Sequence, residues 1–234
     1  MNKVDIVALG PGASDLLSQR AMEILQQSDG IYCPRSNGKS YAKEILLQRS
    51  IPEEKIICYN LPMSPDRVEA QQVYHHIAEE LAQKAHQGLA ISLVAEGDVS
   101  IYSSSHYISH ILEGKGISVR HHAGIPSFIE AASALNISLV EGNETLVVSA
   151  GKISKSLLDS VALGGTSLVV VKLSLCEDEA KRLIQEYASR IRFYYCSYIS
   201  RSNAHYEREA EQICKQPFAY FSLLICRSRL NLNN

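Results

Sequence analysis

Short apolar runs and longer stretches with helical spacing alternate along the first half of the chain. The apolar runs show little of the alternation that marks a half-exposed strand, which is typical of strands covered by helices on both faces. The expected strands are VDIVAL at 4–9, IYC at 31–33, KIICYN at 55–60, LAISLV at 89–94 and ISVRHH at 117–122. Helical spacing covers residues 16–27, 41–48, 67–86 and 104–112. This βαβ rhythm predicts an α/β domain with a mostly parallel sheet flanked by helices.

The pattern changes after the stretch AGIPSF at 123–128. Four strand-like runs follow, several of them long and compatible with hairpins, and we expect two helices between them. The runs are TLVVSA at 145–150, SLVVVKL at 167–173, FYYCSYI at 193–199 and AYFSLLICRSR at 219–229. A glycine and a proline in AGIPSF interrupt the earlier pattern and could form a hinge. The sequence therefore predicts two α/β domains, residues 1–123 and residues 124–234.

Composition narrows the class of protein. Of the 234 residues, 46% are hydrophobic and 21% are charged, which is typical of a soluble globular protein. The net charge of −2 gives no support to nucleic-acid binding. No apolar run has the length of a membrane span or of a signal-peptide core, so we expect a cytoplasmic protein without a membrane partner. The six cysteines lack the close spacing of a zinc site and are predicted to be buried free thiols.

The turn LGPGASD at 9–15 follows the first expected strand and opens the first helix. A dinucleotide-binding fingerprint would need glycine where Asp15 stands, which disfavours a nicotinamide oxidoreductase. Pro11 also removes an amide that could bind phosphate. Glycines at such a turn either let the backbone approach a ligand or simply make a tight connection, and both interpretations stay open.

The stretch RSNGKS at 35–40 resembles the end of a phosphate-binding loop. A complete P-loop would need glycine where Cys33 stands, so we reject triphosphate binding here. Arg35 and Lys39 are then either solvated loop charges or contacts for an anionic substrate.

The stretch EGDVSIYSS at 96–104 follows the expected strand 89–94 and so lies at the carboxyl end of the sheet, where open α/β folds bind ligands. Glu96 and Asp98 flank Gly97, a combination that favours a cationic or hydroxyl-bearing ligand over a phosphate. The alternative is a polar turn in which Asp98 or Ser100 caps the next helix.

His106 and His110 are four residues apart on an expected helix, a spacing that could place both on one metal ion. No third ligand is evident nearby, so we predict no metal site.

These motifs resemble those of the tetrapyrrole methylases, enzymes that methylate corrin and porphyrin precursors. LGPG after the first strand, EGDVSIYSS at mid-chain and AGIPSF after it occur in that family's order. Within the family the chain is most similar to the precorrin-2 C20-methyltransferases, which have GDPSLYST and PGIPSF at the last two places. The further similar stretches are YCPRSNGKSYAKEI at 32–45, NLPM at 60–63, VVVKLS at 169–174 and YFSLLICR at 220–227. The chain departs from the pattern at Val99 and Ala123, where the family has proline, and neither change removes a group that would perform chemistry.

The resemblance implies a two-domain α/β fold with a mostly parallel N-terminal sheet, a mixed C-terminal sheet and a cofactor cleft between the domains. It also implies a homodimer that binds S-adenosylmethionine, held mainly by backbone groups. The cofactor-binding residues expected from it are Pro11, Glu96, Gly97, Asp98, Ile101 and Tyr102, with Ser127 and Lys172 closing the pocket.

The activity implied is methylation of precorrin-2, or of its cobalt form, at C20 in cobalamin biosynthesis. Methyl transfer from a sulfonium needs no covalent intermediate, so we nominate no general base and expect Tyr102 to orient the ring. The substrate carries many carboxylates, and the candidates to bind them are Arg35, Lys39 and Arg67. Met63 is the candidate to pack on the face of the macrocycle, the alternative being simple filler. The alternatives are a methylase of the same family with another target, and an inactive cofactor-binding module.

Overall fold

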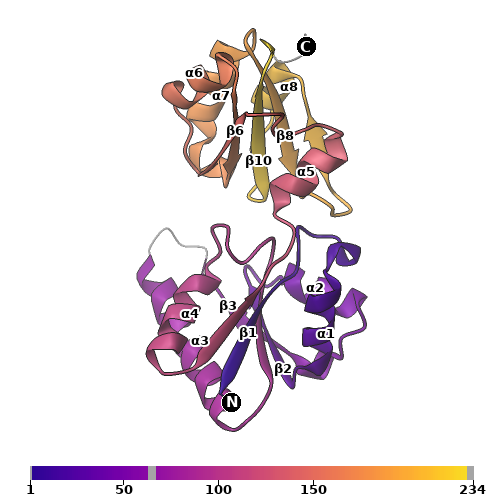
Figure 1. The fold of residues 1–234 in the computed structure, drawn as a ribbon, viewed down its shortest axis with the longest axis vertical. Coiled ribbons are helices and arrows are strands. Elements are labelled where there is room, and N and C mark those ends of the chain that lie inside the picture. Colours follow the sequence, from indigo (N-terminus) through magenta and orange to yellow (C-terminus); the bar gives the residue numbers. More distant parts are fainter. Residues whose placement is uncertain (1, 63–66, 231–234) are drawn as a thin grey trace. The chain divides into compact units, whose positions relative to one another are not determined.

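The computed structural model describes residues 2–62 and 67–230, apart from the side chain of Arg67. The chain divides into two compact units, Met1–Pro126 (unit 1) and Ser127–Asn234 (unit 2). The boundary expected between residues 123 and 124 lies in the same AGIPSF stretch as this division. Each unit has its own five-stranded sheet with helices against it (Figure 1).

Unit 1 has a sheet in which every neighbouring pair of strands is parallel, in the order β3-β2-β4-β1-β5. Its strands are β1 (Lys3–Ala8), β2 (Gly30–Arg35), β3 (Ile56–Asn60), β4 (Ile91–Ala95) and β5 (Ser118–His122). Its helices are α1 (Gln19–Gln27), α2 (Tyr41–Gln48), α3 (Arg67–His86) and α4 (Ser105–Gly114), with short 3-10 turns at Ser14–Leu16 and Glu53–Lys55.

Helices cover both faces of this sheet, as the apolar runs predicted. Figure 1 shows α1 and α2 on one face and α3 and α4 on the other. Alternate residues of one strand therefore enter different cores: Val7 of β1 packs with the α1 and α2 side, whereas Ile6 and Ala8 pack with the α3 and α4 side. This double burial is the physical reason why the inner strands β2, β4 and β1 carry few polar residues, whereas the edge strand β5 is mostly exposed and carries Arg120, His121 and His122.

Serine caps set where the first two helices begin. The Ser18 hydroxyl accepts the Ala21 amide at 3.2 Å, and the Ser40 hydroxyl accepts the Lys43 amide at the same distance. The helix expected from residue 16 thus begins at Gln19 instead, after a 3-10 turn. Such caps satisfy amides that the first helical turn leaves unpaired.

Unit 2 has a mixed sheet in the order β6-β7-β10-β8-β9. The strands are β6 (Thr145–Ala150), β7 (Thr166–Val171), β8 (Ile191–Ser197), β9 (His205–Glu207) and β10 (Ser222–Ser228). Only β6 and β7 pair in parallel, while β10 lies between β7 and β8 and is antiparallel to both. The helices are α5 (Ser127–Leu135), α6 (Lys155–Ala162), α7 (Glu177–Tyr187) and α8 (Ala210–Lys215).

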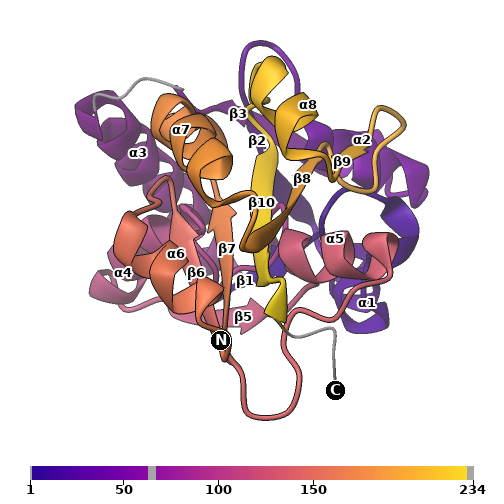
Figure 2. The same ribbon diagram turned by 90° about the horizontal axis from the view of Figure 1, so that it is seen from above.

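The two faces of the second sheet are also covered. Phe128 and Leu135 of α5 pack on one face, and residues of α6, α7 and α8 pack on the other (Figure 2). The expected α/β class, with a mostly parallel first sheet and a mixed second sheet, is confirmed.

Three elements of unit 2 were not expected from the sequence: α5, which precedes the first expected strand, β9, with only three residues, and α8, with six. β9 and α8 are too short to show a period, and β9 is held by its pairing with β8 rather than by its own pattern. In the part of the chain that the structure describes, no helix is both long enough and apolar enough to cross a bilayer.

Candidate functional site

The turns that follow β1 and β4 are joined by a pair of backbone hydrogen bonds. The Gly97 amide donates to the Gly10 oxygen at 2.7 Å, and the Gly10 amide donates to the Gly97 oxygen at 3.1 Å. Both glycines have a positive φ, +77° for Gly10 and +72° for Gly97. Glycine adopts this conformation without steric cost, so the two motifs singled out in the sequence meet as one structure.

These turns lie at a topological switch point of the first sheet. From β1 the chain continues to β2 on one side of the sheet order, and from β4 it crosses to β5 on the opposite side. Connections that leave neighbouring strands in opposite directions open a crevice at their carboxyl ends, where α/β folds bind ligands. The switch point is therefore the position in unit 1 that the topology favours for a ligand.

A third segment joins the turns at Gly124, just after β5. A Cβ added to Gly124 would lie 2.6 Å from the Ala8 Cβ and 2.8 Å from the Gly97 oxygen. No side chain fits at these distances, so glycine is required by close packing. We call Gly10, Gly97, Asp98 and Gly124 the switch-point cluster.

Asp98 holds the cluster together through its carboxylate. Oδ2 accepts the Gly124 amide at 2.7 Å, and Oδ1 accepts the Ser100 amide at 2.8 Å as well as the Ser100 hydroxyl. Burial acts to raise the pKa of Asp98, but these hydrogen bonds outweigh it and lower the pKa below the usual value. The Asp98 side chain is buried, and both of its carboxylate oxygens accept hydrogen bonds from within the protein. Asp98 therefore positions the turn.

The surface beside Gly97 is open and partly apolar. A Cβ at Gly97 would meet no protein atom within 4 Å. Ile101 and Tyr102 are 38% and 50% exposed. Tyr102 has φ +50°, a conformation that costs a residue with a side chain energy and is concentrated at functional sites. Of the remaining residues expected here, Pro11 is buried and Glu96 is half-buried.

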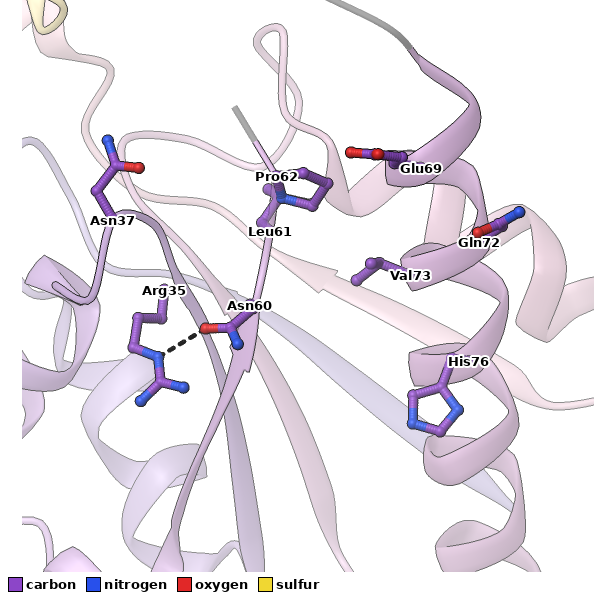
Figure 3. A pocket seen from close by; sticks show the side chains of 9 residues that line it. All are labelled: Arg35, Asn37, Asn60, Leu61, Pro62, Glu69, Gln72, Val73 and His76. Atoms are coloured by element: carbon purple, nitrogen blue, oxygen red, sulfur yellow. Dashed lines mark hydrogen bonds between the residues drawn. The ribbon is translucent and has the colours of Figure 1, made fainter. Parts of the chain in front are cut away.

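A groove lies at the carboxyl ends of β2 and β3, against the first turns of α3 (Figure 3). Its volume is about 670 Å³. It is lined by Arg35, Asn37, Asn60, Leu61, Pro62, Glu69, Gln72, Val73 and His76, and we call it the Arg35 groove. β2 and β4 are parallel neighbours, so their carboxyl ends lie at the same edge of the sheet. The Arg35 groove and the switch-point cluster are therefore on the same edge of unit 1.

The other residues expected to bind substrate are placed differently. Lys39 is exposed in the turn that closes by mutual backbone hydrogen bonds with Ser36, and it is not among the lining residues of the groove. Arg67 opens α3, but its side chain lies outside the described residues, as does Met63.

Ser127 and Lys172 belong to unit 2. Ser127 is the first residue of α5. Lys172 is exposed and follows β7 in the left-handed conformation, with φ +53°. Their contribution to cofactor binding stays a prediction.

Several residues of the site escaped the sequence reasoning, among them Gly124, Ser100 and Asn60. Gly124 was taken only as a hinge position and Ser100 only as a helix cap. The sequence signal for Gly124 was its position just after an expected strand, which it shares with Gly10 and Gly97. Glycines that follow neighbouring strands of one sheet can contact one another. Asn60 belongs to the NLPM stretch at 60–63, but nothing in the sequence pointed to its hydrogen bond with Arg35, since that contact depends on strand pairing.

The two histidines considered as metal ligands do not form a metal site. The rings of His106 and His110 have centroids 6.5 Å apart, and the His110 Nδ1 lies 3.5 Å from a Glu113 oxygen. Within the described residues, no group of three or more His, Cys, Asp or Glu side chains is placed to hold a metal ion.

Comparisons with known proteins agree with these features. The family model of the "Tetrapyrrole (Corrin/Porphyrin) Methylases" matches residues 3–213. A "Probable cobalt-precorrin-2 C(20)-methyltransferase" of Methanocaldococcus jannaschii is 30% identical over 150 residues, which are 63% of this chain and 64% of that protein. A "Cobalt-precorrin-2 C(20)-methyltransferase" of Salmonella typhimurium is 25% identical over 191 residues, which are 81% of this chain and 71% of that protein.

Solved structures show the same fold at low sequence identity. A cobalt precorrin-4 methyltransferase has a TM-score of 0.75 at 14% identity, with 97% of this chain and 95% of that chain covered. A uroporphyrin-III C-methyltransferase from Thermus thermophilus, complexed with S-adenosyl homocysteine, has a TM-score of 0.66 at 13% identity, with 96% and 97% covered. The resemblance expected from the motifs is confirmed by the family match over 3–213. The chain belongs to the tetrapyrrole (corrin/porphyrin) methylases.

Proposed function

We propose that the protein is an S-adenosylmethionine-dependent methyltransferase that methylates a tetrapyrrole in cobalamin biosynthesis. Membership of the family, over residues 3–213, is the observation that carries this proposal. The relatives from M. jannaschii and S. typhimurium, both named as methyltransferases, support it. The alignments span 64% and 71% of those two proteins.

For the target atom we propose C20 of precorrin-2 or of its cobalt form. Both relatives just mentioned are named for that position. A precorrin-4 C(11)-methyltransferase from Sinorhizobium is 31% identical, but over 138 residues that are 58% of this chain and 48% of that protein. The larger share covered by the C20 enzyme from Salmonella favours C20 over C11.

The switch-point cluster fits the proposed cofactor. The space over Gly97 is open, so a ligand can approach the backbone there. The switch-point cluster contains no lysine or arginine, which disfavours a phosphate as its ligand. The exposed ring of Tyr102 is a surface of the kind that attracts cations. A folded methyl donor with a sulfonium centre matches this combination of open backbone and aromatic surface.

The protein's part in the reaction is positioning. Bound S-adenosylmethionine supplies an electrophilic methyl group for a carbon of the tetrapyrrole. Gly10 and Gly97 fix the backbone against which the donor rests, and Asp98 and Gly124 keep that backbone in place. Alignment of two reactants can supply on the order of 7–11 kcal/mol of a barrier, so we assign no residue as a general base.

We further propose that Glu96, Ile101 and Tyr102 contact the cofactor together with Pro11. For Ser127 and Lys172 the basis is the family motif alone. Arg35 and Lys39 are proposed to bind substrate carboxylates.

The test is to incubate the protein with S-adenosylmethionine carrying a ¹³C-labelled methyl group and with precorrin-2, with and without cobalt. We expect the product to gain one methyl group by mass and to show the label at C20 by NMR. A label at another ring carbon would reject the proposed position and keep the reaction. No methylated product from either form would leave the inactive binding module as the better account.

A further inference from the structure

A second pocket of unit 1 lies between the sheet and the last turns of α3. Its volume is about 430 Å³, within the range of roughly 300–1,000 Å³ that is usual for sites of small organic ligands. We call it the Tyr32 pocket, and its lining residues are Tyr32, Ile57, Glu80, Gln83, Lys84 and Gln87. Tyr32 and Ile57 belong to the first halves of β2 and β3. The pocket is therefore nearer the amino ends of the strands, whereas the switch-point cluster lies at their carboxyl ends.

A buried tyrosine hydroxyl is the unusual feature of this pocket. Tyr32 is 1% exposed and packs in the core on the α3 and α4 side of the sheet. Among the residues that the structure describes, its hydroxyl oxygen has no hydrogen-bond partner. Burial and the nearby Glu80 carboxylate raise the pKa of Tyr32, so the hydroxyl keeps its proton. A buried polar group without a partner destabilises the folded state, which favours a ligand that supplies the partner.

Two opposite charges that line the same pocket are not paired with each other. Glu80 and Lys84 are four residues apart on α3, in the order and at the spacing that favour an ion pair on one helix face. Within residues 2–62 and 67–230, however, the half-buried Lys84 side chain makes no ion pair and no hydrogen bond. A Glu80 oxygen lies 3.1 Å from the Nε2 of His76, which leaves other acceptor positions of this carboxylate open. An anion and a cation held apart in one pocket match a zwitterion.

The remaining polar groups of the pocket are two amides. Gln83 and Gln87 are exposed and also lie four residues apart on one side of α3. Neither side chain makes a hydrogen bond in the part of the chain that the structure describes. A glutamine amide carries both donors and an acceptor, so it complements a hydroxyl or another amide. These two residues favour a ligand whose third group is polar and uncharged.

We propose that the Tyr32 pocket binds an α-amino acid with an uncharged polar side chain. The ammonium group of the ligand donates to the Glu80 carboxylate and to the Tyr32 oxygen, and its carboxylate accepts from Lys84. The side chain of the ligand lies against Gln83 and Gln87. Rotamer changes of side chains at a binding surface are common, and a change at Glu80 or Lys84 gives the ligand access to the hydroxyl. The site is separate from the site of methyl transfer, so it does not rest on the proposed function.

The probe is L-glutamine, titrated into the whole protein and followed by NMR. Two analogues each remove one charge of the ligand: N-acetyl-L-glutamine lacks the ammonium group, and L-glutaminamide lacks the carboxylate. We expect L-glutamine to bind and each analogue to bind about tenfold more weakly or worse, the usual effect of losing a hydrogen bond to a charged group. If L-glutamine does not bind, or if all three compounds bind equally, the inference is wrong.

The protein side of the two charges is tested with Glu80→Gln and Lys84→Met. Each variant should weaken L-glutamine binding by about tenfold or more, for the same reason. The matched control is Lys152→Met, which removes an exposed lysine of unit 2 and should leave the affinity unchanged. Equal affinities of Lys84→Met and Lys152→Met would overturn the assignment of the carboxylate to Lys84.

Tyr32→Phe distinguishes a hydroxyl that binds a ligand from one with a structural role. The variant should bind L-glutamine several-fold more weakly than the wild type. In the absence of ligand, its midpoint of urea denaturation should equal or exceed the wild-type value, because the variant lacks a buried polar group without a partner. A lower midpoint would show that the hydroxyl bonds within the protein, and that result, like wild-type affinity for L-glutamine, would overturn the inference.

Failure of the inference and failure of the proposed function have different signatures. Gly97→Val should bind L-glutamine as the wild type does, and Lys84→Met should bind S-adenosyl homocysteine as the wild type does. A wild type that binds L-glutamine but not S-adenosyl homocysteine contradicts the proposed function alone, and the reverse contradicts the inference alone. Loss of L-glutamine binding in Gly97→Val would place the amino acid at the switch-point cluster and reject the Tyr32 pocket.

Discussion

At the scale of single residues, Gly124 is the position where the switch-point cluster leaves the least space. Gly124→Ala would force apart Ala8 and Gly97, whose nearest atoms lie 2.6 Å and 2.8 Å from the added Cβ. We expect the free energy of unfolding to fall by about 1–3 kcal/mol, as for overpacked sites. The control is Gly114→Ala at the end of α4, where a Cβ meets no atom within 4 Å and helix propensity favours alanine. Equal stabilities of Gly124→Ala and the wild type in urea denaturation would contradict the close packing.

Asp98 predicts a pH dependence of stability. Its pKa is lowered in the folded protein, so its contribution is fully present above the unfolded-state pKa of about 3.9 and is lost as the pH falls through the folded-state pKa. Asp98→Asn should reduce the free energy of unfolding at pH 7 by about 1.5–3 kcal/mol, the range for hydrogen bonds to a charged group. The difference between variant and wild type should shrink below about pH 4, as measured by urea denaturation across pH. A difference that stays constant down to pH 2 would show that the charge of Asp98 contributes nothing.

At the scale of elements, the sequence predicts which helices and strands exist better than it predicts which of them lie next to one another. Helices α2 and α3 occupy the ranges that the apolar spacing predicted, because each buries one continuous face. The insertion of β10 between β7 and β8 could not be predicted, since strand order depends on contacts between residues far apart in the chain. The same limit applies to the site. The sequence motifs identified the turns after β1 and β4 as candidate sites. They could not show that Gly124 contacts both turns, or that Asn60 bonds to Arg35, because these contacts depend on the order of the strands in the sheet.

A buried ion pair joins β10 to the segment that precedes β6. Arg227, 5% exposed, donates to the Leu139 oxygen at 2.7 Å and pairs with the Glu144 carboxylate. Arg227→Ala would leave the Glu144 charge buried beside a cavity, so we expect a loss of about 3–5 kcal/mol in the free energy of unfolding. The comparison is Arg182→Ala on α7, whose partners are exposed and whose loss should matter little. If both variants unfold at the same denaturant concentration, the pair does not stabilise unit 2.

At the scale of the whole molecule, cofactor binding should appear as stability. A ligand that binds only the folded state adds about 2.7 kcal/mol at a concentration 100 times its dissociation constant. We expect S-adenosyl homocysteine to raise the melting temperature in proportion to the logarithm of its concentration, and ATP at the same concentrations to have no effect because no P-loop is present. A melting temperature unmoved by S-adenosyl homocysteine, or moved equally by ATP, would contradict the cofactor assignment.

The central claim is that the methyl donor rests on the backbone at Gly97. Its most direct test is calorimetric titration of S-adenosyl homocysteine into the wild type, Gly97→Val and Gly88→Val. Gly97 and Gly88 have φ values of +72° and +84°, and a Cβ at either meets no atom within 4 Å, so the two substitutions strain the backbone alike. Gly88 follows α3 at the amino ends of the strands, away from the switch-point cluster. We predict that Gly88→Val binds as the wild type does and that Gly97→Val does not bind; wild-type affinity in Gly97→Val would contradict the account.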